Sequence, residues 1–321
     1  MPVQQEKENA TYTPIQDYGV IGNLHTTALV SITGSIDFMC YPRFDSPTVF
    51  ASILDAGKGG AFSIAPEDGD FRTKQLYLPG TNILLTRFLC EKGISEMTDF
   101  MPVTDCNEGF ALYRKIRCIS GEQTYRIVCN ARFDYARGES KVSKDHQVYE
   151  LISSTDDQPN LLLESDCELG KENDGVAGTI SLKAGEEHIF FMRHPDNKLT
   201  LEDYLPEFKK CHAYWTNWIK GTDYSGPWKE AVLRSALAMK LLTSAQFGST
   251  VAAATFGLPE VIGGERNWDY RYTWIRDSAF TMYAFLRLGF TEEADHFMEW
   301  IKEVACEKLQ LLYGVDGNSE L

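Results

Sequence analysis

Residues 267–277 read NWDYRYTWIRD, and the rest of the chain is organised as a scaffold around this stretch. Four aromatic residues, two arginines and two aspartates occupy its 11 positions. Aromatic faces stack on sugar rings, and Arg and Asp side chains supply fixed donors and acceptors for hydroxyl groups. A helical pattern starts at Ser278, immediately afterwards. The stretch therefore predicts a sugar-binding loop that leads into a helix.

Within this stretch, Trp274, Arg276 and Asp277 are the strongest candidates for substrate binding. A sugar site needs an aromatic platform, a forked donor and a carboxylate acceptor on a rigid frame. Tyr270 and Tyr272 lie two positions apart, as expected of an extended lip. Structural alternatives remain for each residue. Asp277 could be the N-cap of the following helix, Arg276 a surface ion-pair partner, and the tyrosines ordinary edge packing.

A second loop, residues 41–47, places Arg43 and Asp45 two positions apart between prolines. Loops carry functional residues more often than cores do. The alternative is a turn held by its own Arg and Asp, and the sequence leaves both interpretations open.

Composition narrows the class of protein. The 321 residues suggest about two domains. A net charge of −15 argues against nucleic acid and anionic membranes and for a neutral or cationic ligand. The chain shows no apolar signal-like segment at its start and no long apolar run, which predicts a cytoplasmic protein. We expect no cofactor, and the oligomeric state stays open.

The eight cysteines are scattered and form no C-x-x-C motif, which indicates reduced, mostly buried thiols and no metal site. The six histidines show no ligand spacing, and the G-x-S-x-G and Walker-type motifs are absent. Acidic residues are numerous, but nothing local pairs two of them as a catalytic acid and base.

Residues 15–187 carry a strand-like pattern. Short apolar runs are separated by Gly, Asp and Asn turns, which is typical of an antiparallel β-sandwich. We therefore assign residues 1–197 to an N-terminal β-sandwich domain. The expected strands are residues 28–32, 36–40, 82–89, 94–100, 112–119, 124–133, 147–153, 160–163, 179–182 and 187–192.

The apolar period then changes to that of helices. Residues 278–288, the third expected helix, are apolar nearly all round, so we expect most faces of this helix to be buried. Residues 198–248 are predicted to form a helical linker with the first helices, and residues 249–321 the beginning of a helical domain. Four helices would leave apolar surface uncovered, which suggests part of a longer protein. The expected helices are residues 201–221, 227–247, 278–288 and 291–305.

The sequence resembles glycoside hydrolase family 15, the glucoamylase and trehalase-like group. Its early blocks are closer to the trehalase-like branch than to secreted glucoamylases. The blocks are long and ordered, and they span nearly the whole chain. They read DYGVIGNLHTTALVSITGSIDFMCYPRFDSPTVF (17–50), YLPGTNILLTRF (77–88), MTDFMPV (97–103) and RSALAMKLLTSAQFGSTVAAATFGLPEVIGGERNWDYRYTWIRDSAFTMYAFLRLGF (234–290).

The resemblance implies a β-sandwich of the supersandwich type, a helical linker, and an (α/α)6 barrel that this chain does not complete. It also implies hydrolysis of an α-glucoside, trehalose or a short α-glucan, with inversion by two glutamates and an activated water. By resemblance, Trp274, Arg276 and Asp277 hold the terminal glucosyl unit, and Tyr270 and Tyr272 form the aromatic lip. Both glutamates are expected beyond the C-terminal end, so this chain alone should lack catalysis.

Two other functions compete with hydrolysis. A shortened relative could bind sugar without cleaving it, in which case the chain would bind glucosides and release no glucose. A disaccharide phosphorylase could pair a similar β domain with a helical barrel, in which case phosphate would be consumed and glucose 1-phosphate released. The quoted blocks do not favour the phosphorylase.

Overall fold

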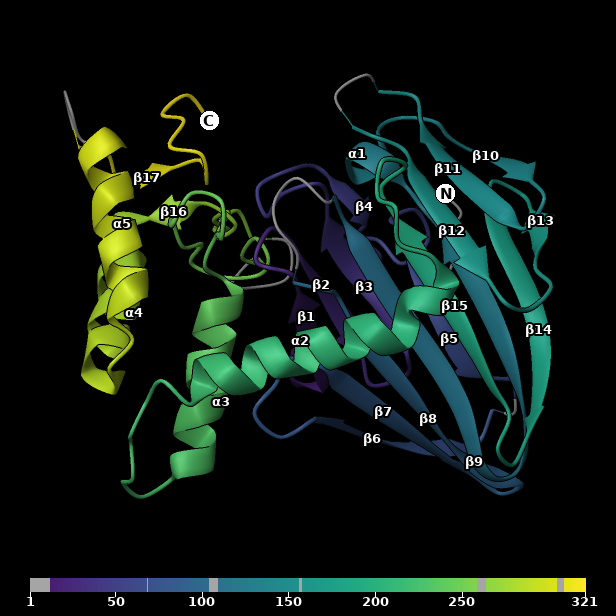
Figure 1. Cartoon of the computed structure of the whole chain (residues 1–321). Coiled ribbons are helices and arrows are strands. Elements are labelled where there is room, and N and C mark those ends of the chain that lie inside the picture. Colours follow the sequence, from purple (N-terminus) through teal and green to yellow (C-terminus); the bar gives the residue numbers. More distant parts are fainter. Residues whose placement is uncertain (1–11, 68, 104–108, 156–157, 259–263, 305–308) are drawn as a thin grey trace, which may run out of the picture.

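The computed structural model shows a large β-rich part followed by helices (Figure 1). It describes residues 12–67, 69–103, 109–155, 158–258, 264–304 and 309–321. The strands of the first part are β1 (Tyr18–Gly22), β2 (Thr27–Ser31), β3 (Ser35–Cys40), β4 (Thr48–Phe50), β5 (Ala61–Pro66), β6 (Phe71–Tyr77), β7 (Leu84–Cys90), β8 (Gly93–Phe100), β9 (Ala111–Asn130), β10 (Ser140–Asp145), β11 (Val148–Ser153), β12 (Leu161–Ser165), β13 (Gly170–Glu172), β14 (Gly175–Lys183) and β15 (Glu187–Arg193).

The long strand β9 joins two antiparallel sheets. Its first half pairs with β8 and β15, in the order β6-β7-β8-β9-β15-β12-β11-β10. Its second half pairs with β5 and β14, next to β3, β2 and β1. The strand bends at Gly121, where φ is +74° and an added Cβ would lie 1.9 Å from the Lys92 carbonyl oxygen. Only glycine fits such a position without strain.

The sequence prediction of two separate strands, residues 112–119 and 124–133, is therefore wrong, because the backbone continues through Gly121 as one strand. The prediction of an antiparallel β domain is confirmed, since every pairing among β1–β15 is antiparallel.

Apolar side chains from the two sheets meet in one core, the arrangement of a sandwich. Phe62 of β5 lies 6.4 Å from Phe190 of β15 between ring centroids. One ion pair is embedded there: Arg114 and Asp99 are fully buried and lie 2.7 Å apart. Arg114 also donates to the Gly34 carbonyl at 2.8 Å. A buried charge is tolerated only when it is paired in this way.

The helical part begins against the outer face of the sheet that contains β8, the first half of β9 and β15 (Figure 1). Tyr113 of β9 stacks on Phe191 at 4.2 Å and meets Tyr204 of α2 at 5.7 Å. The side chains of Thr200 and Asp203 form a capping box that starts this helical run. The remaining elements are η1 (Ile15–Asp17), α1 (Phe133–Ala136), η2 (Leu201–Asp203), α2 (Tyr204–Ile219), α3 (Lys229–Leu241), β16 (Thr273–Trp274), α4 (Ile275–Leu288), α5 (Thr291–Val304) and β17 (Leu312–Tyr313).

Helix predictions succeed in type and fail at some ends. Helix α3 is shorter than the predicted 227–247, because Trp228 has a left-handed backbone (φ 63°) and Thr243 forms a bridge with Thr250. Gly289 ends α4 at φ +91°, as expected of a C-terminal glycine. Residue 305, the predicted end of the last helix, lies outside the described residues.

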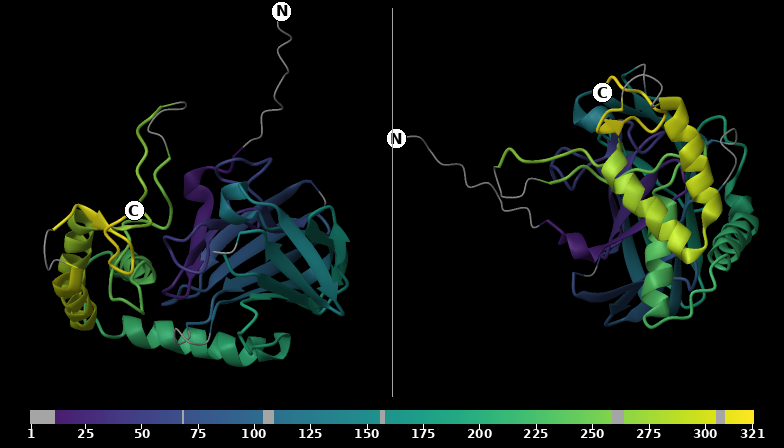
Figure 2. Two further views of the ribbon diagram at one scale, coloured as in Figure 1. Left: turned by 90° about the horizontal axis from the view of Figure 1, so that it is seen from above. Right: turned by 90° about the vertical axis from the view of Figure 1, so that its left-hand side faces the viewer.

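The prediction that the third helix is buried on most faces is wrong. Met282 and Phe285 of α4 are buried, but Phe280, Tyr283 and Leu286 are exposed, Phe280 by 72%. No described element covers that face, so the expectation of uncovered apolar surface is confirmed (Figure 2). Across the described ranges, each helix is too short or too polar to traverse a lipid bilayer.

Candidate functional site

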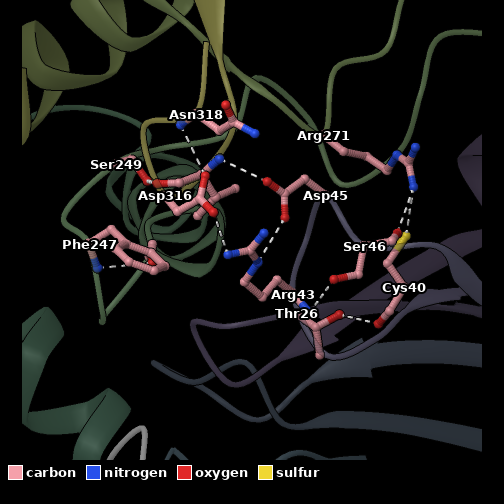
Figure 3. Close-up of polar contacts among 12 residues, drawn as sticks. Thr26, Cys40, Arg43, Asp45, Ser46, Phe247, Ser249, Arg271, Asp316 and Asn318 are labelled. Carbon is pink, nitrogen blue, oxygen red and sulfur yellow. Dashed lines mark hydrogen bonds and ion pairs between the residues drawn. The ribbon is translucent and has the colours of Figure 1, made fainter. Parts of the chain in front are cut away.

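Arg271 anchors the NWDYRYTWIRD segment to the β domain. Its guanidinium forms two-pronged hydrogen bonds with Asp269 and donates to the Ser46 carbonyl at 3.0 Å and to the Cys40 sulfur at 3.2 Å. Figure 3 shows Arg271 reaching both β-domain residues. Burial works against the charge of Arg271, but the hydrogen bond to Asp269 and the charges of Cys40, Tyr135 and Asp269 together raise the Arg271 pKa. Arg271 is therefore a charged, buried side chain that links the segment to the β domain.

The same anchor surrounds Tyr272. Burial raises the pKa of the Tyr272 hydroxyl first, and the charges of Asp269 and Asp45 raise it further, while Arg271 opposes them. The charged residues that act on this pKa are therefore those of the anchor and of the Arg43–Asp45 loop. The role of Tyr272 in an aromatic lip with Tyr270 stays a prediction.

The other four predicted residues form a continuous chain of contacts. The rings of Tyr270 and Trp274 lie 5.9 Å apart, and the Arg276 guanidinium sits 5.6 Å from the Trp274 ring centre. Arg276 then donates to Asp277 Oδ2 through Nε at 3.1 Å and Nη2 at 2.8 Å. We call Tyr270, Trp274, Arg276 and Asp277 the aromatic–ionic row. An aromatic plane, a forked donor and a carboxylate are therefore adjacent in space.

Backbone contacts fix the position of this row. Trp274 belongs to β16, which pairs with β17, and its indole N–H donates to the Asp269 carbonyl at 2.8 Å. Helix α4 begins at Ile275, so Arg276 and Asp277 lie in its first turn. The N-cap alternative for Asp277 is wrong, because Trp274 occupies that position without a side-chain cap. Arg276 does form a surface ion pair, as its structural alternative predicted, and Asp277 is the partner.

A neighbouring loop supports the segment from the other side. The amides of Ala253 and Ala252 donate to the Tyr270 and Tyr272 carbonyls at 2.8 and 3.2 Å. Phe256 of this loop meets Phe38 of β3, with ring centroids 5.1 Å apart. An apolar cavity of about 450 Å³ lies between this loop and β1–β2, and Tyr270 lines it.

The Arg43–Asp45 loop also ties distant parts of the chain together. Arg43 pairs with Asp45 at 3.2 Å and with Asp316 at 2.8 Å, and Asp45 Oδ2 accepts from the Val315 amide at 2.8 Å (Figure 3). The pair does hold its own loop, and it also docks residues 315–316 onto the β domain. Ser249 fixes the same residues by donating to the Val315 carbonyl at 2.7 Å.

Comparisons with known proteins agree with this architecture. Residues 7–208 match the family described as "Trehalase-like, N-terminal", and residues 226–321 match "Glycosyl hydrolases family 15". The chain belongs to the trehalase- and glucoamylase-like glycoside hydrolase family 15. The resemblance deduced from the sequence blocks is thereby confirmed.

Curated relatives in this family 15 group are called trehalase. One from Thermoplasma volcanium is 34% identical over 97% of this chain and 51% of its own length. One from Mycolicibacterium smegmatis is 33% identical with the same coverage, and one from Thermoplasma acidophilum is 35% identical over 91% of this chain and 51% of its own. The chain therefore spans about half the length of the curated relatives it matches.

A solved structure shares the fold of this family 15 chain. A bacterial glucoamylase, solved in complex with acarbose, matches 99% of this chain and 54% of its own, with a TM-score of 0.70. Its sequence identity is 14%, so the likeness concerns the fold.

Sequence reasoning missed the structural role of Arg271 and of Asp316. Arg271 contacts Cys40 across 231 positions, and Asp316 contacts Arg43 across 273. No local pattern carries such a signal. The expectation of reduced, mostly buried cysteines is confirmed for the described residues: Cys40, Cys118, Cys129 and Cys211 are buried, Cys90 and Cys167 are half-buried, and none of these six forms a disulfide, while Cys106 and Cys306 lie outside the described residues.

Proposed function

We propose that this chain is the N-terminal half of an inverting α-glucoside hydrolase that acts on trehalose. The observation that carries the proposal is the aromatic–ionic row, which stands within a chain that is 34% identical to a trehalase over nearly its full length. A short α-glucan is the second substrate to test.

The proposed architecture follows the family pattern. Residues 1–197 form the supersandwich domain, residues 198–248 the helical linker and first helices, and residues 249–321 the beginning of an (α/α)6 barrel. The exposed apolar side chains of Phe280, Tyr283 and Leu286 support a barrel that further helices complete. The two catalytic glutamates lie in those later helices.

In this mechanism the row binds one glucosyl unit. The Trp274 ring packs against the sugar face, Arg276 donates to its hydroxyl oxygens, and the Asp277 carboxylate accepts from its hydroxyl groups. The row thereby holds the anomeric carbon between the two glutamates. One glutamate takes a proton from water as the water attacks, and the other protonates the departing oxygen, giving two glucose molecules. The described cysteines form no disulfide, which supports the cytoplasmic location expected from the sequence.

The test is to follow trehalose cleavage by the full-length protein with proton NMR. Inversion releases one glucose as the β-anomer and its partner as the α-anomer in equal initial amounts. Initial formation of the α-anomer alone would contradict inversion. Phosphate-dependent formation of glucose 1-phosphate would establish the phosphorylase instead, and saturable binding without cleavage would establish the sugar-binding relative.

A further inference from the structure

An aspartate, a cysteine and a histidine converge at the edge of the β domain. Asp166 and Cys167 follow β12 directly, and His188 belongs to β15, the strand that pairs with β12. One potential ligand atom from each side chain lies within 4.8 Å of the other two. None of the three takes part in the aromatic–ionic row, and the proposed hydrolysis gives them no role.

Hydrogen bonds hold the aspartate and the histidine in place. Asp166 Oδ1 lies 2.9 Å from His188 Nδ1 and also accepts from the Ile189 amide at 3.0 Å. The Asp166 amide donates in turn to the Ile189 carbonyl at 3.3 Å. The carboxylate is thus fixed to the strand that carries the imidazole.

The spacing of the three groups is close to that of a metal centre. Zinc bonds of about 2.0–2.3 Å place neighbouring ligand atoms roughly 3.3–3.8 Å apart in a tetrahedron. No pair of the three atoms exceeds 4.8 Å, so the widest pair closes by at most about 1 Å, and Asp166 Oδ1 and His188 Nδ1, now 2.9 Å apart, move slightly away from each other. Side-chain rotation can supply this, because Asp166 and His188 are 39% and 29% exposed. That exposure also leaves room for water as a further ligand.

The local charge favours a cation. The Asp166 carboxylate lies 2.9 Å from His188 Nδ1, and a second acid, Glu186, is two positions before His188 in the sequence. A cysteine binds metal as its thiolate, so metal binding must displace the Cys167 thiol proton. Thiolate and imidazole are typical ligands of zinc, whereas magnesium and calcium prefer oxygen ligands alone.

We propose that Asp166, Cys167 and His188 form a binding site for a divalent transition-metal ion, with Zn²⁺ as the best match to their oxygen, sulfur and nitrogen atoms. Binding releases the thiol proton to solvent and forms the metal–sulfur bond, with no change of oxidation state. The ion ties the end of β12 to β15 and takes water as its remaining ligand. This site does not depend on the proposed hydrolase function.

The experiment is a Co²⁺ titration of the purified, tag-free chain, followed by displacement with Zn²⁺. Unaltered protein should develop the near-ultraviolet absorption of a cobalt–thiolate bond, and Zn²⁺ should abolish it. Cys167→Ser should lose this band, and His188→Gln should weaken the apparent Co²⁺ affinity by at least about tenfold. The matched control is Cys90→Ser, a half-buried cysteine of β7, because three strands separate β7 from β12 in the same sheet. This control should keep the band.

Two outcomes would overturn the proposal. One is a native chain, folded by circular dichroism, that shows no saturable thiolate band. The other is a band that persists in Cys167→Ser. Because the first of these uses the unaltered protein, a folding defect in a variant cannot rescue the proposal.

Discussion

The segment of residues 267–277 contains two arginine–aspartate pairs that differ in exposure. In the first pair, the Arg271 and Asp269 side chains are 5% and 28% exposed, and Arg271 also contacts Cys40 of the β domain. In the second pair, Arg276 and Asp277 are 63% and 34% exposed and lie in the first turn of α4. The same two residue types thus form a largely buried pair that holds the segment to the β domain and a solvent-facing pair at the start of α4.

This difference separates what a ligand can use from what the fold needs. A buried pair is costly to break, because removing one partner leaves an uncompensated charge. An exposed pair contributes little to stability, so its residues are available to bind a substrate. We therefore propose that Arg271 and Asp269 position the segment and that Arg276 and Asp277 contact the sugar.

The largest expected effect on stability comes from Arg271→Met. The change leaves the Asp269 carboxylate without its ion-pair partner, and it removes the hydrogen bonds from Arg271 to Ser46 and Cys40. We expect the free energy of unfolding to fall by about 3 kcal/mol in urea denaturation. Arg276→Met is the matched control and should lose less than about 1 kcal/mol. Equal losses in both variants would erase the distinction between the pairs.

A smaller effect is expected from Trp274→Phe, which changes the residue that links the two pairs. Phenylalanine keeps an aromatic ring beside Tyr270 but cannot donate to the Asp269 carbonyl. The lost hydrogen bond should cost about 1 kcal/mol of unfolding free energy. Thermal and urea denaturation would measure it, and an unchanged stability would show that the indole bond does not position Trp274.

The smallest effect is expected from Asp316→Asn, at a third arginine–aspartate pair. Burial would raise the pKa of Asp316, but the Asn318 amide and Arg43 lower it below the ordinary value of 3.8. The carboxylate therefore stabilises the fold above pH 3.8, and this contribution is lost as pH falls through the lower folded pKa. Because the pair is partly exposed, the cost at pH 7 should stay below about 1 kcal/mol.

Urea denaturation of wild type and Asp316→Asn across pH would check this sign. The gap between the two proteins should shrink as the solution is acidified below pH 3.8. A gap that widens on acidification would contradict the lowered pKa.

Much of the fold is predictable because the β pattern is local. Alternating apolar residues locate strands such as β7 and β8, and helical periods locate α2 and α5. No local sequence pattern predicts that β9 is one continuous strand. Only the pairing partners distinguish its halves: β8 and β15 pair with the first half, and β5 and β14 with the second. The exposure of α4 is not local either, since an all-round apolar pattern does not show which faces have a partner.

The candidate site likewise has one part that the sequence predicts and another that it does not. Trp274, Arg276 and Asp277 are neighbours in the sequence, so their types alone indicate a sugar site. The anchor was missed because Arg271 finds Ser46 and Cys40 more than 200 positions away. Spacing alone groups Tyr272 with Tyr270, and their shared role as an aromatic lip stays a prediction.

The most direct measurement is trehalose turnover and unfolding free energy of Asp277→Asn in the proposed full-length enzyme. Asp295→Asn, which alters an exposed acid of α5, is the control. The account predicts that Asp277→Asn lowers kcat/KM at least about 100-fold while unfolding free energy changes by less than about 1 kcal/mol, and that Asp295→Asn changes neither. Turnover equal to wild type in a folded Asp277→Asn protein would contradict the assignment of the exposed pair to substrate binding.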